Sequence, residues 1–262
     1  MKTSVVLATH NEELNLERCL QSVKEFADEI VIADGESTDQ TVEIAHNFGA
    51  TIIQTSNKQN FHINKQLAMD AAHGELVLQL DADEVVDGTL RDFIISLSVQ
   101  LAQGSYTQDP VAWKIARYNH FFGRVLTKGG QYPDEVIRLY LKGQARLPQQ
   151  NVHEQMKVNG VVGVAKGHLL HFPYPTFDAY MKKFNIYTSF EASRASLNLL
   201  PIKKSTVWQY LLVKPVTTFS SIFIRHRGYV DGMPGFVFAL MSGLHHPFVL
   251  FKVWALREKS AA

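Results

Sequence analysis

Two aspartates stand one residue apart at the end of an apolar run in the stretch LQLDADEVV, Leu78–Val86. Asp81 and Asp83 are followed directly by Glu84, and the run before them has the length and composition of a buried strand. Paired carboxylates at a strand end offer hard oxygen ligands to Mg²⁺ or Mn²⁺, which fills its remaining positions with water and substrate phosphate. The pair therefore indicates a site for a metal-bound diphosphate, although an isolated Asp-x-Asp is also common in solvated turns.

Strand-like and helix-like patterns alternate through the first hundred residues of the chain. The expected strands cover residues 4–8, 29–34, 50–55 and 75–83, and the expected helices cover residues 11–26, 40–49, 61–74 and about 87–101. This alternation predicts a parallel sheet with helices on both faces, in which ligands bind beyond the carboxyl ends of the strands. Glu12, Asp34, Asp81 and Asp83 all fall at such ends.

The segment from residue 104 to residue 167 has short strand-like pieces with many glycines, prolines and aromatic residues. We expect antiparallel strands and loops there, forming the second half of a site. The whole chain of 262 residues is 46% hydrophobic and 19% charged, which is typical of a globular protein with a core. It has neither a Gly-x-Gly-x-x-Gly motif nor a P-loop, so a glycine-rich loop does not bind the phosphates.

Four motifs occur in a recognisable order: THNE after the first expected strand, ADGESTD after the second, Lys65 in the helix before the fourth, and LDADE at its end. In order and spacing they resemble the family 2 glycosyltransferases of the GT-A fold. The resemblance covers Ser4 to about Val86. It implies an α/β fold, a Rossmann-like sandwich with a mostly parallel central sheet, followed here by a C-terminal helical extension.

The resemblance also implies a role for individual residues. It assigns the nucleotide pocket to Thr9 and Glu12, the uracil N3–H to Asp34, the diphosphate to Lys65, the ribose or metal to Asp81, and the metal to Asp83. The common family pattern has Asp-Asp-Gly-Ser where this chain has Ala33 before Asp34. Asp34 is therefore the remaining candidate for recognising the base.

A narrower resemblance begins in YPDEVIRLY and continues in NVHE and HLLHFPYPTFDAYMKKFNIYT. These stretches are similar to a bacterial subgroup that includes the lipopolysaccharide core β-glucosyltransferases. The similarity implies an inverting enzyme that uses Mn²⁺ or Mg²⁺ and moves a hexose, with glucose favoured, from a UDP-sugar to a membrane-associated glycan or glycolipid. Its place would be lipopolysaccharide core or cell-surface polysaccharide synthesis. The rival hypothesis is a non-catalytic nucleotide-sugar-binding or scaffold protein on the same fold.

An inverting transfer needs a carboxylate that takes the proton of the acceptor hydroxyl. Glu154, which resembles the His-Glu of the subgroup, is the favoured base, and Asp134 is the competitor. His171 is the expected late metal ligand, with His168 as the alternative, although a histidine between apolar residues is also typical of a core. Arg138 either binds phosphate or acceptor, or pairs with Asp134.

The last 62 residues differ from the rest of the chain in charge. Residues 201–262 have eight Lys and Arg against two Asp and Glu, whereas residues 1–200 have 18 against 23. Residues 232–251 contain no charged side chain, but prolines and histidines interrupt the stretch. We expect a catalytic domain over residues 1–200 and a basic, aromatic helical extension over residues 201–262. The extension would contact an anionic membrane peripherally, or pack on the core or a second subunit.

Composition also bears on location and partners. The single cysteine, Cys19, cannot form an internal disulfide, and the first residues lack the apolar core and cleavage site of a signal peptide. Both features favour the cytoplasm, with attachment at the cytoplasmic face of the inner membrane. The formal net charge of +1 and the lack of a nucleic-acid motif argue against binding to nucleic acid, and the oligomeric state stays open.

Overall fold

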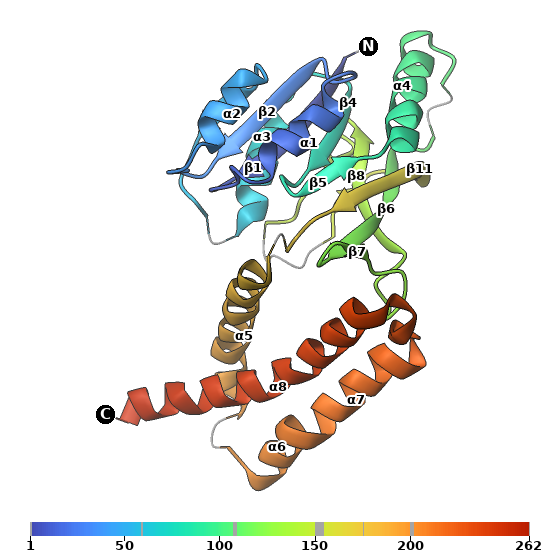
Figure 1. Cartoon of the computed structure of the whole chain (residues 1–262). Coiled ribbons are helices and arrows are strands. Elements are labelled where there is room, and N and C mark those ends of the chain that lie inside the picture. Colours follow the sequence, from blue (N-terminus) through green and yellow to red (C-terminus); the bar gives the residue numbers. More distant parts are fainter. Residues whose placement is uncertain are drawn as a thin grey trace. The chain divides into compact units, whose positions relative to one another are not determined.

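The computed structural model describes residues 2–58, 60–106, 109–149, 155–174, 176–199 and 202–261. They form two compact units (Figure 1). Unit 1 consists of Met1–Arg117 and Asp134–His171, and unit 2 consists of Tyr118–Pro133 and Phe172–Ala262. The boundary expected between residues 200 and 201 thus differs from the division seen here, in which α5 (Phe177–Leu199) belongs with α8 (Gly232–Ala261) and packs against it.

Unit 1 is built on a mixed sheet with the strand order β3-β2-β1-β4-β8-β6-β11-β5. Pairs β3–β2, β2–β1 and β1–β4 are parallel, whereas β4–β8, β8–β6 and β11–β5 are antiparallel. Its elements are, in chain order, β1 (Thr3–Thr9), α1 (Leu16–Val23), β2 (Glu29–Asp34), α2 (Thr41–Asn47), β3 (Thr51–Gln54), α3 (Phe61–Ala71), β4 (Leu76–Leu80), β5 (Glu84–Val86), α4 (Gly88–Ala102), most of β6 (Ala112–Phe121), β8 (Asp134–Leu141), β9 (Ala145–Arg146), β10 (Lys157–Val158) and β11 (Val162–His171).

Side chains from alternate positions of the central strands enter two different cores. In β1, Val5 and Leu7 pack with residues of α1 and α4, whereas Val6 packs with Ala68 and Met69 of α3. This alternation follows from the two-residue period of a strand, and it requires helices on both faces of the sheet. The predicted α/β architecture with a helical C-terminal part is therefore confirmed, and its parallel strands end where the polar motifs begin.

Unit 2 is mainly helical and includes the end of β6 with its partner β7 (Arg124–Val125). Besides α5 and α8 it contains α6 (Lys204–Trp208), η1 (Gln209–Val213), α7 (Lys214–Ser220), η2 (Ser221–Arg225) and η3 (Gly228–Asp231). The buried carboxylate of Asp231 accepts hydrogen bonds from the backbone and hydroxyl of Thr127 and from the Lys128 backbone, at 2.7–3.1 Å. These bonds attach segment 118–133 to the C-terminal helices.

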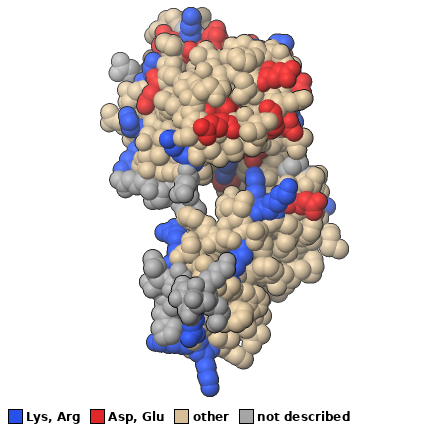
Figure 2. Space-filling model, turned by 90° about the vertical axis from the view of Figure 1, so that its left-hand side faces the viewer, with Lys and Arg blue, Asp and Glu red and all other residues tan. Residues whose placement is uncertain are grey.

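The two units differ in surface character. On the face drawn in Figure 2, acidic side chains gather over unit 1. Many large apolar side chains of unit 2 are exposed, among them Trp208, Val216, Ile224, Met233 and Trp254. Among the described residues, one helical stretch, Gly228–Arg257, is long and apolar enough to cross a membrane by length and composition, and 33% of its apolar window is buried.

Candidate active site

The Asp-x-Asp motif lies in a turn between β4 and β5. Glu84, the residue after the motif, closes this turn with two hydrogen bonds to the backbone of Asp81. The backbone N–H of Glu84 donates to the carbonyl oxygen of Asp81 at 2.9 Å, and the backbone N–H of Asp81 donates to Oε2 of Glu84 at 3.0 Å. The Glu84 side chain is fully buried, and Asp83 stands directly before it in the turn. The positions of Asp81 and Asp83 therefore depend on a carboxylate that solvent does not reach.

Two cations bind the Asp81 carboxylate. Lys65 of α3 contacts Oδ1 through its ammonium group, and Arg138 of β8 donates from Nη2 to Oδ2 at 2.5 Å. Burial alone would raise the pKa of Asp81, but the charges of Arg138 and Lys65 hold it well below its ordinary value. Burial lowers the pKa of Lys65, and Arg138 acts in the same direction while Asp81 opposes it. Asp81 is therefore an anion held between two nearly buried cations.

A second arginine extends this charge network to Asp134. Arg117 of β6 lies 3.2 Å from Oε1 of Glu84 through Nη1, and its Nη2 lies 2.7 Å from Oδ2 of Asp134. Arg138 also donates to Oε1 of Glu84, at 3.1 Å. Six charged side chains thus alternate in sign in the order Lys65, Asp81, Arg138, Glu84, Arg117, Asp134.

Of the two roles left open for Arg138, pairing with Asp134 is not the one seen. Its guanidinium contacts Asp81 and Glu84 instead. The strand register explains the difference, because Arg117 stands directly opposite Asp134 in the β6–β8 pair. Arg138 is four residues further along β8, beside β4, where Gln79 also accepts a hydrogen bond from it.

The two expected metal ligands, Asp83 and His171, lie near each other. Oδ2 of Asp83 is 3.6 Å from Nε2 of His171, and their side chains are 14% and 17% exposed. Pairing of β5 with β11 causes this proximity, because it sets His171 opposite Glu84, the residue after Asp83. His168, the alternative, instead contacts the Asp87 carboxylate with its backbone N–H at 3.0 Å and Nδ1 at 3.3 Å.

The donor set of Asp83 and His171 fits a divalent ion that takes few protein ligands. Mg²⁺ binds oxygen at about 2.0–2.1 Å and usually uses one or two carboxylates plus waters and substrate phosphates. Carboxylate and water ligands also suit Mn²⁺. In the part of the chain that the structure describes, no three His, Cys, Asp or Glu side chains form a group that could hold a metal. Waters or a phosphate would therefore have to supply most of the coordination.

The expected nucleotide residues lie at the ends of β1 and β2. Thr9 and Asp34 are register partners, and the Thr9 hydroxyl donates to Oδ1 of Asp34 at 3.1 Å. Asp34 also accepts from the backbone and the hydroxyl of Ser37, at 3.0 and 2.6 Å. Glu12 accepts from the Asn15 side chain at 2.9 Å. The structure thus brings Thr9 and Asp34 together, and Asp34 also closes the turn that follows β2.

The structure describes one of the two base candidates. Glu154 lies outside the described residues. Asp134 is partly exposed, and its Oδ2 accepts from both Nε and Nη2 of Arg117, at 3.0 and 2.7 Å. Asp134 therefore forms an ion pair with Arg117. Such a pair is the structural alternative to a role as the base.

Sequence reasoning gave no role to Gln79, Glu84 or Arg117. Gln79 is fully buried, and its side chain accepts from Arg138 and donates to Oδ1 of Asp81 at 3.3 Å. A glutamine in the otherwise apolar run LVLQL was a usable signal, because a buried amide requires hydrogen-bond partners. The identity of those partners depends on pairing between strands about 60 residues apart, which spacing alone does not reveal.

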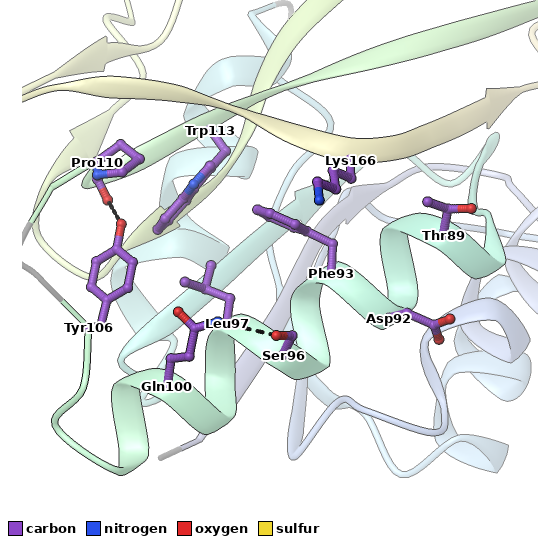
Figure 3. Close-up of a pocket in the computed structure, with 10 residues that line it drawn as sticks. All are labelled: Thr89, Asp92, Phe93, Ser96, Leu97, Gln100, Tyr106, Pro110, Trp113 and Lys166. Atoms are coloured by element: carbon purple, nitrogen blue, oxygen red, sulfur yellow. Dashed lines mark hydrogen bonds between the residues drawn. The ribbon is translucent and has the colours of Figure 1, made fainter.

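A separate cavity of about 480 Å³ opens between α4, β6 and β11 in unit 1 (Figure 3). Phe93, Leu97, Tyr106 and Trp113 supply its apolar lining, and the Tyr106 hydroxyl donates to the carbonyl oxygen of Pro110 at 2.5 Å. None of the residues expected in the active site lines this cavity.

Solved structures of other proteins share the fold of this chain. A structure of S. aureus TarS, residues 1–349, in complex with UDP has a TM-score of 0.50 at 15% identity and covers 97% of this chain and 88% of its own. The mannosyltransferase PcManGT from Pyrobaculum calidifontis, in complex with GDP-Man and Mn²⁺, has a TM-score of 0.50 at 12% identity and covers 97% and 87%. The fold is that of the GT-A glycosyltransferases.

Sequence comparison identifies the kind of enzyme. Residues 4–122 match the model of glycosyl transferase family 2. Together with relatives that are named glycosyltransferases and match over most of the chain, this similarity shows that the chain is a glycosyltransferase. The lipopolysaccharide core biosynthesis glycosyltransferase LpsC of Rhizobium meliloti is 27% identical over 93% of this chain and 88% of its own length. An uncharacterized glycosyltransferase of Rickettsia typhi is 27% identical over 99% and 89%. The resemblance to lipopolysaccharide core glycosyltransferases is thus confirmed.

Proposed function

We propose that the chain transfers a hexose from a UDP-sugar, with inversion and with the help of Mn²⁺ or Mg²⁺, to a membrane-associated glycan or glycolipid acceptor. The observation that carries this proposal is the turn after β4, which holds Asp81 between two cations and sets Asp83 beside His171. Such a site suits a diphosphate, because it combines fixed positive charge with hard ligands for a divalent ion.

In this proposal the site residues divide the work. Asp83 and His171 would hold the divalent ion, which stabilises the negative charge of the departing diphosphate. Asp81 orients Lys65 and Arg138, and Lys65, to which the resemblance assigns the diphosphate, is the candidate for a direct phosphate contact. Burial strengthens the attraction of these charges for a phosphate relative to the same charges in water.

Asp34 is proposed to recognise the base, with Thr9 and Glu12 lining the same pocket. The Asp34 carboxylate is nearly fully buried and already accepts hydrogen bonds from Thr9 and Ser37. Because each carboxylate oxygen has about two acceptor positions, Oδ2 retains capacity for a uracil N3–H. TarS, which shares the fold, has been solved with UDP.

Glu154 is proposed as the base that removes the acceptor hydroxyl proton, and Asp134 is the second candidate. Asp134 is bound by Arg117 through one oxygen. An ion pair of this kind already gives Asp134 a structural role, which favours Glu154 as the base.

The acceptor and the location are inferred from unit 2 and from the relatives. LpsC is named for lipopolysaccharide core biosynthesis, and its similarity covers most of both chains. The exposed apolar side chains of unit 2, together with the basic excess of residues 201–262, suit contact with an anionic lipid surface. We therefore propose a cytoplasmic enzyme attached to the inner face of the inner membrane.

Release of UDP tests the proposal. The purified chain is incubated with a panel of UDP-sugars, beginning with UDP-glucose, with and without Mn²⁺ and with lipopolysaccharide core acceptors of defined length. We expect metal-dependent release of UDP that increases with a suitable acceptor. Binding of UDP without any release from any UDP-sugar would instead identify a non-catalytic nucleotide-sugar-binding protein.

A further inference from the structure

The fully buried Glu84 is the common partner of both arginines in the charge network. Its Oε2 accepts from the Asp81 backbone at 3.0 Å, and its Oε1 accepts from Arg117 at 3.2 Å and from Arg138 at 3.1 Å. Three donors, one from the turn after β4 and one each from β6 and β8, therefore converge on the Glu84 side chain. Both oxygens of the buried Glu84 carboxylate accept hydrogen bonds from protein groups, so the contacts of Glu84 are with the protein.

Fold stability gives a poor reason for this arrangement. Taking a carboxylate and two guanidinium groups out of water is costly, and replacing such a network by apolar side chains is often neutral or stabilising. A buried network that is fully hydrogen-bonded does, however, fix the orientation of its members. Groups that contact a ligand depend on such support for their geometry.

The position of Glu84 links it to the candidate metal ligands and to Asp81. It follows Asp83 in the chain and stands opposite His171 in the β5–β11 pair. It also closes the turn at Asp81, as its two hydrogen bonds to the Asp81 backbone show. A change in the Glu84 carboxylate would therefore move both aspartates of the motif and release Arg138, which clamps Asp81.

We propose that Glu84 is a positioning residue of the donor site, which holds the turn bearing Asp81 and Asp83 and anchors Arg138 and Arg117 to it. The inference rests on the proposed transfer of a sugar from a nucleotide donor at this turn. It adds that Glu84 supports donor binding and has no part in recognition of the acceptor.

Glu84→Gln in the full chain tests the proposal, with Glu29→Gln as the matched control. Glu29 is also a largely buried glutamate that accepts several hydrogen bonds, from Ser4 and His73, but it lies at the amino end of β2. For Glu84→Gln we expect kcat/KM for the UDP-sugar to fall about 10–100-fold, as is typical when support of a binding group is lost. Glu29→Gln should retain the parent kcat/KM even if its thermal unfolding midpoint falls as far as that of Glu84→Gln.

The Michaelis constants separate positioning from a loss of folded protein. In Glu84→Gln, KM for the UDP-sugar and the dissociation constant of UDP should rise about tenfold, whereas KM for the acceptor should not change. Partial unfolding would lower the apparent kcat and leave both KM values unchanged. Donor parameters of Glu84→Gln within twofold of the parent values would overturn the proposal.

A second variant, Arg117→Met, keeps the test valid if Glu84→Gln does not fold. It should also raise the donor KM. Where Glu84→Gln does fold, the two effects in the double variant should be less than additive because both residues act through one network. Parent-like donor binding in Arg117→Met, or full additivity, would contradict the proposal. If the parent binds UDP but transfers no sugar, the proposed function fails, and the UDP dissociation constants still decide the role of Glu84. If the parent binds no UDP, both fail.

Discussion

Asp81 and Asp83 are separated by one residue in the chain but have different partners in the structure. Asp81 is held by Lys65 and Arg138, whereas Asp83 lies beside His171. A carboxylate already bound by two cations is a poorer metal ligand than one beside an imidazole, because its lone pairs and its charge are largely occupied. The motif therefore separates into one residue that orients positive charge and one that faces the candidate metal position.

This division predicts that Asp83→Ala abolishes the metal-dependent part of UDP binding without unfolding the protein. Calorimetric titration with UDP, with and without Mn²⁺, measures the effect, and the affinity of the variant in Mn²⁺ should equal its affinity without metal. Asp92→Ala, which removes an exposed carboxylate of α4, is the control and should bind UDP like the parent. Unchanged Mn²⁺-dependent affinity in Asp83→Ala would exclude the metal role.

Asp34 presents a different case, because its carboxylate has a structural role whether or not it recognises a base. Asp34→Ala should weaken UDP binding by about 1.5–3 kcal/mol, the contribution of a hydrogen bond to a charged group. Ser37→Ala removes a hydroxyl that donates to Asp34 but keeps the carboxylate, so it reports the cost of loosening the turn alone. If both variants weaken UDP binding equally in a competition assay, Asp34 only closes the turn.

The two base candidates are separated by amide substitutions that keep shape and remove basicity. Glu154→Gln should lower sugar transfer by about 10²–10⁴-fold while binding of the UDP-sugar persists. Asp134→Asn weakens an ion pair with Arg117 and should have a smaller effect on kcat. Normal transfer in Glu154→Gln together with a severe loss in Asp134→Asn would assign the base to Asp134.

At the scale of elements, the first half of unit 1 could be predicted from local patterns. The run EIVIAD predicted a strand ending at Asp34, and β2 ends there. The helical spacing after Asp87 predicted a helix to about Leu101, and α4 ends at Ala102. These patterns are local, because burial on one or both faces imposes a period of two or 3.6 residues on the sequence itself.

The charge network could not be predicted in the same way. Its members come from α3, the turn after β4, β5, β6 and β8, and they meet only after pairing of distant segments, much of it antiparallel. The sequence suggested Asp134, four residues away in the chain, as a partner of Arg138, whereas the register gives that carboxylate to Arg117. The sequence therefore predicts the site residues that lie in motifs at the ends of strands. It does not predict the contacts between side chains of different strands.

The amino end of β2 provides a pH test of the fold away from the site. Burial would raise the pKa of Glu29, but hydrogen bonds from the His73 backbone and from Ser4, with further contributions from the His73 ring, lower it from 4.5 to about 2. A depressed pKa stabilises the folded state above about pH 4.5, and this contribution is lost as the pH falls towards 2. It amounts to at most about 3 kcal/mol.

Glu29→Gln should therefore reduce the free energy of unfolding at pH 7 and flatten its dependence on pH between about 4.5 and 2. Urea unfolding at several pH values in this interval measures both effects. A variant whose stability falls with acid as steeply as that of the parent would show that other carboxylates dominate this range.

At the scale of the whole molecule, charge and apolar exposure are distributed unevenly along the chain. Residues 1–200 have a formal charge of −5, from 18 basic and 23 acidic side chains, and residues 201–262 have +6, from eight and two. One of the two acidic residues in the second set, Asp231, is buried in hydrogen bonds to Thr127 and Lys128. Among residues 202–257, the structure describes seven basic side chains and one carboxylate, the buried Asp231, amid exposed apolar side chains.

This combination predicts that the full chain binds anionic vesicles through unit 2. Each basic residue near an anionic surface contributes about 1 kcal/mol, and insertion of apolar side chains adds to this. Truncation before residue 201 would divide a compact unit, because α5 packs on α8, so surface substitutions in the full chain are the sharper test. The test variant replaces with serine four side chains that are each more than half exposed: Trp208, Val216, Ile224 and Met233.

In a flotation assay, the parent should float with vesicles containing anionic lipid more than with neutral ones, and salt should weaken the binding because it screens the charges. The serine variant should stay at the bottom. A control with serine at Leu14, Val161 and Val164, exposed apolar residues of unit 1, should float like the parent.

Extraction of the parent from cell membranes by high salt or alkaline carbonate indicates a peripheral attachment. A need for detergent would mean that Gly228–Arg257 enters the bilayer core, as its length and composition permit. Flotation of neither parent nor variant would mean that the exposed apolar side chains of unit 2 face protein, and the membrane proposal would then be wrong.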